Sequence, residues 1–490
     1  MLESAAGKYR KGACRSNSSP KVRGRAASLF SAIVLLAALV SCGHPAGGTQ
    51  GPPENGDIRE PSTGVFPSLR LTIAADEIHR TIWAPNIMVS LENAGQAYEF
   101  ANATAQVRGR GNSTWHFMGD KRPFRIRFDS ARPMFGSAYS ARDWTVIANA
   151  MDYSLMRQYS AYFLGRMLDG QCFAPAGHFV HVYLDGEYRG VYMVSDQMQV
   201  LVPGRAELAS NLDPALSEYF LEWCGRSGGD EFSVVVQVAG NARSQDIPFV
   251  IDFPGGGILR QGLGHKDFVA GFLDDVSRAI HRGHRDEISR LIDLNSFVDF
   301  YLVQELFKNH DSFWSSLFFQ IRQVEGSPRL FAGPLWDFDH SSGGGDDGVS
   351  DYSPRGAWVA RWNGWFRSLM GTEWFSQQAA RRWNEIRGVE VARMIGRIWE
   401  LAETYRSCFE RNFERWPDKL GQYLWRTPPE VQAIPDFIGN VEYLVDWLER
   451  RIVWMNGFFA QNLRTRVMQA GSDTPVVLAP PQEAAPRVSP

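Results

Sequence analysis

Lysine is scarce in this chain of 490 residues. After Cys42 it occurs only at Lys121, Lys266, Lys308 and Lys419, and arginine carries nearly all the remaining positive charge. A surface position tolerates either residue, so a lysine kept where arginine is the default is a candidate for a point-charge role, such as binding a phosphate. The formal net charge of −3 lacks the positive excess that nucleic-acid binding requires, and we predict no nucleic-acid partner.

Near the N-terminus the chain lacks an apolar run long enough to span a bilayer as a permanent helix, since residues 29–40 are too few. Basic residues precede this run, and it ends in Leu39-Val40-Ser41-Cys42-Gly43. This pattern is typical of a bacterial lipoprotein signal peptide, whose cysteine is diacylated and becomes the mature N-terminus. We predict a signal peptide over residues 1–42 and a lipid on Cys42. The lipid would anchor the protein in the membrane, on the extracytoplasmic side of the bacterial cell envelope.

Cysteine is also rare, with five in the chain, and no two of them have the spacing of metal ligands. Cys14 and Cys42 belong to the predicted signal peptide, which leaves Cys172, Cys224 and Cys408. In an oxidising compartment three thiols allow one disulfide and one unpaired cysteine. The sequence does not select the pair, although Cys172 with Cys224 would close the shorter loop.

The middle of the chain has the composition of a folded domain. Residues 43–67 are rich in Gly, Pro, Ser and Thr and predict a flexible tether, and the Pro- and Ala-rich residues 466–490 predict a disordered tail. The chain is 44% hydrophobic and 13% aromatic, enough to bury a large core, so we predict a folded domain over residues 68–465.

Within this domain the hydrophobic period changes from that of strands to that of helices. The first part, about 68–200, contains short alternating runs and one prominent helix over 152–168 that begins with Asp152 as its cap. Two of these runs flank Asp185-Gly186, a strong hairpin pattern. The later part, about 265–465, predicts one or two helices over 288–307 and single helices over 268–280, 358–370, 372–386, 390–416 and 441–463. The fold class is therefore α+β.

A glycine-rich turn, Gly109-Arg110-Gly111, follows the strand that ends at Arg108. Such a backbone can approach a phosphate closely, with its amide groups and Arg108 or Arg110 as donors, although a plain hairpin is the more common reason for glycines between strands. Lys121 lies just after the turn, at the start of the strand over 124–128. This neighbour strengthens the phosphate interpretation.

Two acidic motifs flank one apolar run. Asn309-His310-Asp311 precedes it and Trp336-Asp337-Phe338-Asp339 follows it, while residues 313–321 predict a buried strand because aromatic and branched residues crowd a run without Gly or Pro. Asp beside Asn is often only a turn former. Three acids around one rigid element nevertheless favour metal, phosphate or proton chemistry, which needs fixed carboxylates. The acidic, glycine-rich residues 341–348 predict a flexible loop, either a lid or disordered.

Taken together, these features resemble the spore coat protein H (CotH) kinase family. The similarity covers about 69–463 and rests on motifs at 107–115, Lys121, 143–144 with 152–157, 185–192, 309–311 and 336–339. The resemblance implies an atypical protein-kinase-like fold with a mainly β N-lobe and a mainly helical C-lobe. It also implies that ATP and a divalent metal, Mg²⁺ or Mn²⁺, bind in the cleft, and that a Ser or Thr hydroxyl of a protein is phosphorylated.

The resemblance also assigns roles to residues. Lys121 would bind the nucleotide phosphates beside the glycine-rich turn, Asp311 would accept the proton of the attacking hydroxyl, and Asp337 and Asp339 would hold the metal. Their order along the chain, cation then base then metal-binding acids, is that of protein kinases.

Two departures from the family pattern affect these roles. Kinases and most relatives have Asn five residues after the catalytic Asp, whereas this chain has Ser316, a weaker ligand for a second metal. The helix over 152–168 offers no Glu to pair with Lys121, and Asp196 stands where relatives often carry Glu. The ion pair that orients the lysine must then come from elsewhere or be missing.

Two other functions fit parts of the pattern. One is a catalytically inactive scaffold or binding protein of the same fold that serves in envelope or coat assembly, which the loss of Asn at position 316 favours. The other is a glycoside hydrolase with Asp311 and either Asp337 or Asp339 as its carboxylate pair in a Trp-rich cleft. Trp358, Trp362 and Trp365 have helical spacing, however, which suits a core better.

Overall fold

The computed structural model describes residues 65–135, 140–168, 174–197, 208–227, 229–345, 351–420 and 426–467. By its contacts the chain divides into two units, Met1–Asn55 and Gly56–Pro490, and all described residues belong to the second. The predicted signal peptide with Cys42, nearly all of the tether, Cys172 and residues 468–490 lie outside the described residues. In the described part, Cys224 and Cys408 are free thiols, and no helix has the length and apolar character needed to cross a membrane.

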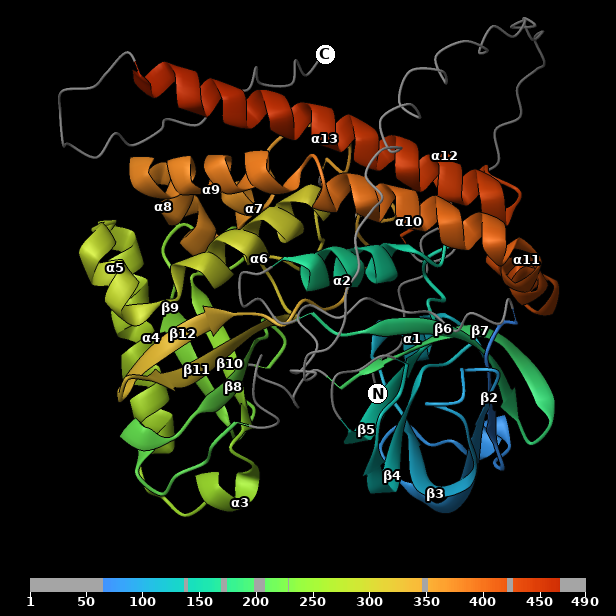
Figure 1. The fold of residues 1–490 in the computed structure, drawn as a ribbon. Helices are drawn as coiled ribbons and strands as arrows, with labels where there is room; N and C mark the ends of the chain where they lie inside the picture. The colour runs from blue at the N-terminus through green and yellow to red at the C-terminus, as the bar shows by residue number, and fades with distance from the viewer. Residues whose placement is uncertain are drawn as a thin grey trace, which may run out of the picture. The chain divides into compact units, whose positions relative to one another are not determined.

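The first strands form a closed barrel in the order β1-β2-β3-β4-β5-β7-β6 (Figure 1). Neighbouring strands are antiparallel except where β1 pairs with β6 in parallel, with Leu69 opposite Val182. The bounds are Ser68–Leu71 for β1, Ala84–Glu92 for β2, Phe100–Gly109 for β3, Phe124–Arg132 for β4, Ala141–Ile147 for β5, Gly177–Leu184 for β6 and Glu187–Asp196 for β7.

Alternation of apolar and polar residues explains why these segments close on themselves. The buried side chains are spaced two residues apart on β3 and on β4, and they join one core inside the barrel: Ala105 and Val107 on β3, and Phe124, Ile126 and Phe128 on β4. The hairpin between β6 and β7 is confirmed. Asp185 and Gly186 have φ of +45° and +79°, the left-handed pair of a two-residue turn.

A second sheet has the order β12-β11-β8-β10-β9. Its strands are β8 (Tyr219–Trp223), β9 (Ser233–Gln237), β10 (Asp246–Phe253), β11 (Leu317–Val324) and β12 (Ser327–Ala332). The sequence assigned no structure to the part that forms β8, β9 and β10. β11 and β12 lie within the part predicted as mainly helical.

Helices form most of the remainder. The long α13 packs against α9 and α10, and α2 packs against α6 and α10 (Figure 1). Their bounds are Ser113–Phe117 for α1, Arg157–Met167 for α2, Gly256–Leu259 for α3, His265–Arg282 for α4, Arg285–Leu291 for α5, Leu294–Phe307 for α6, Val359–Trp362 for α7, Gly364–Gly371 for α8, Glu373–Ile386 for α9, Glu390–Thr404 for α10, Arg406–Arg415 for α11, Pro429–Gln432 for α12 and Phe437–Val467 for α13. Short 3-10 turns are Ala75–Glu77, Pro214–Leu216 and Pro417–Lys419.

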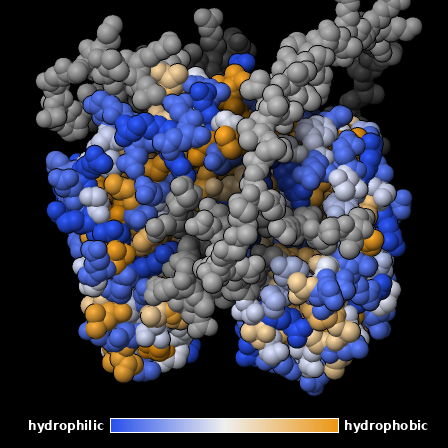
Figure 2. All heavy atoms as spheres, viewed as in Figure 1, coloured by the Kyte–Doolittle hydropathy of each residue, from blue (hydrophilic) through white to orange (hydrophobic). Residues whose placement is uncertain are grey.

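The α+β class, with a β-rich N-terminal region and a helical C-terminal region, is confirmed. On the face drawn in Figure 2, hydrophilic residues predominate and hydrophobic ones appear in scattered groups, as expected when the core lies inside. The folded part also begins slightly earlier than predicted. Phe66, which we assigned to the tether, is 6% exposed and its ring lies 5.1 Å from that of Tyr405 on the helical side.

Three predicted helices differ from the structure. The helix predicted over 358–370 is divided into α7 and α8 at Asn363. The helix predicted from Asp152 begins at Arg157, because residues 152–156 form turns in which the Asp152 carboxylate accepts the Arg157 amide. The helix predicted over 390–416 is two helices, which separate at Tyr405 although no Gly or Pro marks the break.

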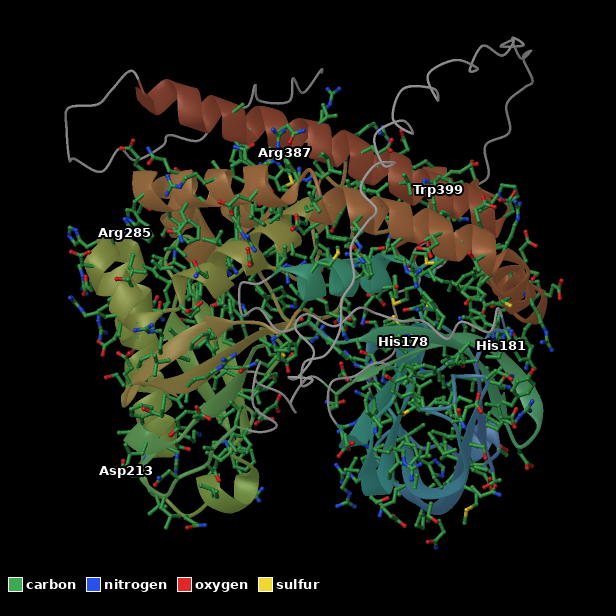
Figure 3. All side chains as sticks on the ribbon, viewed as in Figure 1. His178, His181, Asp213, Arg285, Arg387 and Trp399 are labelled. Carbon is green, nitrogen blue, oxygen red and sulfur yellow. The ribbon has the colours of Figure 1, made fainter. Side chains whose placement is uncertain are left out.

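His178 on β6 provides a first prediction (Figure 3). Its ring stacks on Phe135 with centroids 4.9 Å apart, and burial, aided by the charges of Arg166 and Arg397, lowers its pKa to about 3. Because the unfolded chain binds this proton near pH 6.5 and the folded chain does not, the free energy of unfolding contributed by this residue falls as the pH drops below about 6.5.

We therefore expect His178→Gln to be less sensitive to acid than the wild type. Between pH 7 and pH 5 the wild type should lose roughly 2 kcal/mol more of its free energy of unfolding than the variant loses. Urea unfolding at the two pH values measures this difference. Equal losses in the two proteins would show that His178 is protonated in the folded state.

Candidate functional site

The hairpin β11–β12 brings the two acidic motifs together. Phe319 on β11 pairs with Ala332 on β12, so the residues before β11 and those after β12 leave the hairpin at the same end. Asp311 therefore comes close to Asp337 and Asp339.

The segment between Asp311 and β11 is a turn rather than part of the strand. The amides of Trp314 and Ser315 donate to the Asp311 carbonyl at 2.8 and 3.1 Å, and Ser316 has a φ of +59°. The strand predicted over 313–321 therefore begins only at Leu317. Asp337 also has a positive φ, +63°. Positive φ is unusual for residues other than glycine and clusters at functional sites.

A cavity of about 380 Å³ lies at this point and is lined from both the barrel and the second half of the chain. The structure brings together six of the predicted site residues on its wall: Arg110, Gly111, Asp311, Ser316, Asp337 and Asp339. Arg108, Gly109 and Lys121 are not on that wall.

The carboxylates of the cavity repel one another. Burial and the charge of Asp337 raise the pKa of Asp311 to about 7, and the same causes raise the pKa of Asp339 well above its usual value. Ser316 Oγ donates to Asp337 Oδ2 at 2.9 Å and so orients one of these groups.

The donor set fits a divalent cation. In the described part of the chain no three His, Cys, Asp or Glu side chains are grouped as a metal site. Mg²⁺, however, commonly uses only one or two protein carboxylates together with phosphate oxygens and waters. A cation between Asp337 and Asp339 would relieve the repulsion that raises the pKa of Asp339.

Arg110 faces these acids. Its guanidinium carbon lies 5.1 Å from the centre of the Trp336 ring, and the charges of Asp337 and Asp339 oppose the effect of burial, which lowers its pKa. Arg110 is therefore the cation of the glycine-rich turn that can reach an anion in the cavity.

The presence of glycine in that turn is explained mainly by packing and backbone hydrogen bonds rather than by phosphate binding. A Cβ on Gly109 would lie 2.3 Å from the Trp115 ring, and the amides of Gly109 and Arg110 already donate to the carbonyls of His79 and Pro123 at 2.8 and 3.1 Å. These two amides therefore have partners within the barrel. Gly111, with a φ of +86°, is the glycine that lines the cavity.

Lys121 is buried, with 1% of its surface exposed. Its Nζ donates to the Ala148 carbonyl at 2.6 Å, and burial together with the charge of Lys419 lowers its pKa to about 7, while Asp152 acts in the opposite direction. The side chain thus connects barrel segments. The charge of Asp152 favours the protonated lysine, but the Asp152 carboxylate forms its ion pair with Arg157. Asp196 accepts the Ala176 amide at 2.6 Å.

The other site residue placed away from the cavity is Arg108. Its guanidinium carbon lies 5.0 Å from the centre of the Trp83 ring. This contact belongs to the barrel, so of the two arginines considered for the phosphate role only Arg110 reaches the cavity.

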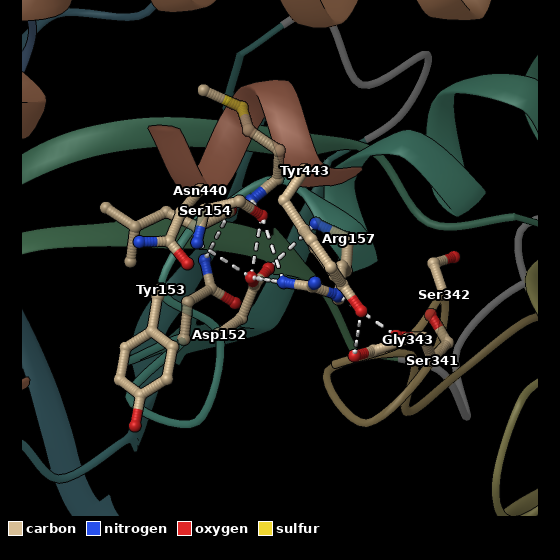
Figure 4. Close-up of polar contacts among 12 residues, drawn as sticks. Asp152, Tyr153, Ser154, Arg157, Ser341, Ser342, Gly343, Asn440 and Tyr443 are labelled. Carbon is tan, nitrogen blue, oxygen red and sulfur yellow. Dashed lines mark hydrogen bonds and ion pairs between the residues drawn. The ribbon is translucent and has the colours of Figure 1, made fainter. Parts of the chain in front are cut away.

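The segment after Asp339 is held in place rather than loose (Figure 4). Its described residues, 341–345, are buried, in contrast to the flexible loop that we predicted. Arg157 Nε donates to the Ser341 carbonyl at 3.0 Å, and Tyr443 Oη donates to the Gly343 carbonyl at 3.3 Å. A Cβ on Gly344 would lie 2.5 Å from Arg157 Nε, so only glycine allows this approach.

Sequence reasoning missed four arginines on the cavity wall, Arg80, Arg226, Arg243 and Arg426. They come from separate loops, which carry no periodic pattern. The one pattern that pointed to any of them is the glycine-rich stretch 225–229, which resembles a turn after a strand.

The cavity places three aspartates and several arginines between a β barrel and a largely helical second half, a set of groups that phosphoryl transfer can use. A family model described as CotH kinase protein matches residues 107–209 and 262–455, more than half of the chain and including both acidic motifs. The chain belongs to this family. A search of curated proteins found no match to the chain.

Proposed function

We propose that the protein transfers the γ-phosphoryl group of ATP to a Ser or Thr hydroxyl of an exported or surface protein. The observation that supports this proposal best is the convergence of Arg110, Asp311, Asp337 and Asp339 on one cavity. Phosphoryl transfer needs a cation on the nucleotide phosphates, a carboxylate beside the attacking hydroxyl and carboxylates that hold a divalent metal.

Each role follows from position. Asp311 accepts the proton of the attacking hydroxyl, because it belongs to the turn at the start of the hairpin and lines the cavity. Arg110 binds phosphate oxygens with its planar guanidinium. Asp337 and Asp339 would hold Mg²⁺ or Mn²⁺, and Ser316 orients Asp337 and offers a further oxygen. When bound, such a cation neutralises negative charge on the phosphate oxygens.

The test is transfer of labelled γ-phosphate by the purified full chain to a mixture of exported proteins, with Mg²⁺ or Mn²⁺ and with EDTA as the control. Thermal unfolding with and without ATP gives a second readout, because a ligand that binds the folded state stabilises it. Metal-dependent transfer supports the proposal. The absence of both transfer and nucleotide stabilisation would rule it out.

A second candidate is a scaffold of the same fold without catalysis. It is favoured by Ser316 in place of Asn and by Lys121, whose Nζ donates to the Ala148 carbonyl away from the cavity. Stabilisation by ATP without transfer to any protein would select this candidate. A Trp-rich sugar-binding cleft finds no support in Trp358 and Trp365, which are each 1% exposed within the core.

Substitutions at Arg110 and Lys121 should differ in their effects. We expect Arg110→Met to raise the KM for ATP about 10-fold, because it removes a charged donor from the cavity. Lys121→Met should change this KM little but lower the free energy of unfolding by about 1–3 kcal/mol, because the buried Ala148 carbonyl loses its donor. Steady-state kinetics and urea unfolding of both variants provide the measurements. The reverse pattern would return the phosphate role to Lys121.

We also propose that lipid on Cys42 anchors the protein to the membrane, at the extracytoplasmic face of the envelope. The support is the sequence pattern around this residue alone. Labelled palmitate should enter the wild type during growth and should not enter Cys42→Ala. Equal labelling of both proteins would contradict the anchor.

A further inference from the structure

Three arginines lie at the Asp311 end of the cavity: Arg226, Arg243 and Arg426. Arg226 follows β8, Arg243 lies between β9 and β10, and Arg426 precedes α12. Together they are called the Asp311-side arginines. Arg243, Arg426 and the loop that carries Arg226 each contact the segment 310–314, which contains Asp311.

Trp314 positions two of them. The guanidinium carbon of Arg243 lies 5.1 Å from the centre of the Trp314 ring and 5.7 Å from that of Phe313. The loop that carries Arg226 is pressed onto the same tryptophan, since the Gly225 amide donates to the Trp314 carbonyl at 2.8 Å. A Cβ on Gly225 would come within 2.5 Å of the Trp314 ring, so this close approach requires glycine.

His310 positions the third. Arg426 Nη1 lies 3.0 Å from His310 Nε2, within hydrogen-bond distance. The charges of all three arginines lower the pKa of Asp311, although burial and Asp337 raise it more strongly. The Asp311-side arginines thus surround the carboxylate that receives the hydroxyl proton in the proposed reaction.

These arginines are separate from the proposed nucleotide-binding cation. Arg110 comes from the barrel and interacts electrostatically with Asp337 and Asp339. Arg226 comes from the second sheet and interacts most strongly with Asp311 and less with Asp337. Arg226 and Arg243 are exposed, and within the described residues neither makes an ion pair with a carboxylate of the chain. Both guanidinium groups line the cavity. Arg226 interacts with the charges of Asp311 and Asp337, but without an ion pair among the described residues both cations are accessible to a ligand that enters there.

We propose that the Asp311-side arginines bind carboxylates of an acidic protein segment, and that the phosphorylated Ser or Thr is flanked by Asp or Glu. The proposal rests on the proposed function for the role of Asp311. Guanidinium groups pair with carboxylates through two parallel hydrogen bonds. Exposed ion pairs are individually weak, so selectivity comes from several pairs together and weakens with salt.

The experiment uses the full chain and three peptides of equal length, each with one Ser flanked by Glu, by Gln or by Lys. Fluorescence anisotropy without ATP measures binding, and transfer kinetics measure the KM values of peptide and ATP. We expect the Glu peptide to bind about 10-fold more tightly than the Gln peptide at low salt, and the difference to shrink at high salt.

The variant Arg226→Gln/Arg243→Gln should lose this preference while keeping the KM for ATP. A matched control, Arg290→Gln/Arg393→Gln, removes two exposed charges elsewhere and should keep the preference. The reversed variant Arg226→Glu/Arg243→Glu should favour the Lys peptide. Thermal unfolding checks that each variant is folded. The salt dependence of peptide binding by the wild type tests the proposal even if a variant fails to fold.

The outcomes separate this proposal from the proposed function. Preference for the Glu peptide that disappears in the double variant supports the acidic-segment site even if no transfer occurs, in which case only the kinase function fails. Equal binding of all three peptides to the wild type overturns the proposal. So does a double variant that keeps the peptide preference but raises the KM for ATP, because the arginines would then bind the nucleotide.

Discussion

Replacement of Asp337 by Asn should lower kcat for phosphoryl transfer by at least about 1,000-fold, which equals about 4 kcal/mol of transition-state stabilisation. Asp337 accepts a hydrogen bond from Ser316 and influences the pKa values of Arg110, Asp311 and Asp339 through its charge. An amide has nearly the same shape as a carboxylate but binds a hard divalent cation far more weakly. The Ser316 hydrogen bond can persist, because Asn keeps one acceptor oxygen.

The loss of activity should come without loss of the fold. Without a metal the carboxylates repel one another, so removing one negative charge should leave the melting temperature of the metal-free protein unchanged or raise it. ATP and Mg²⁺ together should stabilise the wild type and should stabilise Asp337→Asn much less.

The control is Asp267→Asn, which neutralises an exposed carboxylate in the first turn of α4. It should retain full activity. If Asp337→Asn stayed within about 10-fold of the wild type, Asp337 would not hold the metal and the assignment would pass to Asp339.

The local elements could be predicted from the sequence because each has its own period or turn chemistry. The hairpin at Asp185-Gly186 and the strands on either side of the glycine-rich turn are examples. Closure of the barrel could not, since the parallel pairing of Leu69 with Val182 joins segments far apart in the chain. A local sequence pattern does not show which strands far apart in the chain will pair.

The apolar run before β11 shows why residue composition alone misleads. Phe313 is 4% exposed, as in a strand, but its burial comes from a turn packed on Trp358 and Trp362, with ring centroids 6.0 and 6.1 Å away. A short run of apolar residues has the same sequence pattern whether it forms a buried strand or a buried turn.

The predicted site residues also fall into those that the structure brings together and those that it does not. The acids could be predicted because they sit at the two ends of one hairpin, and the structure brings Asp311, Asp337 and Asp339 to one cavity. Lys121 is close to the glycine-rich turn along the chain, but it does not line the cavity, since its Nζ donates to the Ala148 carbonyl instead. The position of a residue in the sequence does not determine where its side chain points or how deeply it is buried.

Replacement of Arg157 by Met should lower the free energy of unfolding by about 3–5 kcal/mol, because it leaves Asp152 buried without its counter-charge. Both side chains are 1% exposed and form an ion pair. The Arg157 Nε also binds the Ser341 carbonyl at 3.0 Å, two residues after Asp339 (Figure 4). One cation therefore stabilises the start of α2 and the segment that follows Asp339.

A double-mutant cycle tests this coupling. Asp152→Asn in the Arg157→Met background should recover part of the lost stability, because the uncompensated charge disappears while one acceptor for the Arg157-position amide remains. In the wild-type background the same Asp152→Asn change should destabilise. Urea unfolding of the four proteins gives the coupling energy, and additive effects would contradict the ion-pair account.

The activity of the same four proteins distinguishes support of the fold from support of the site. If Arg157 positions Asp339 through Ser341, the double variant should remain slow in phosphoryl transfer even where its stability has recovered, because Met cannot donate to that carbonyl. Its affinity for Mn²⁺ in the presence of ATP should fall as well. Recovery of stability and activity together would limit Arg157 to balancing the charge of Asp152.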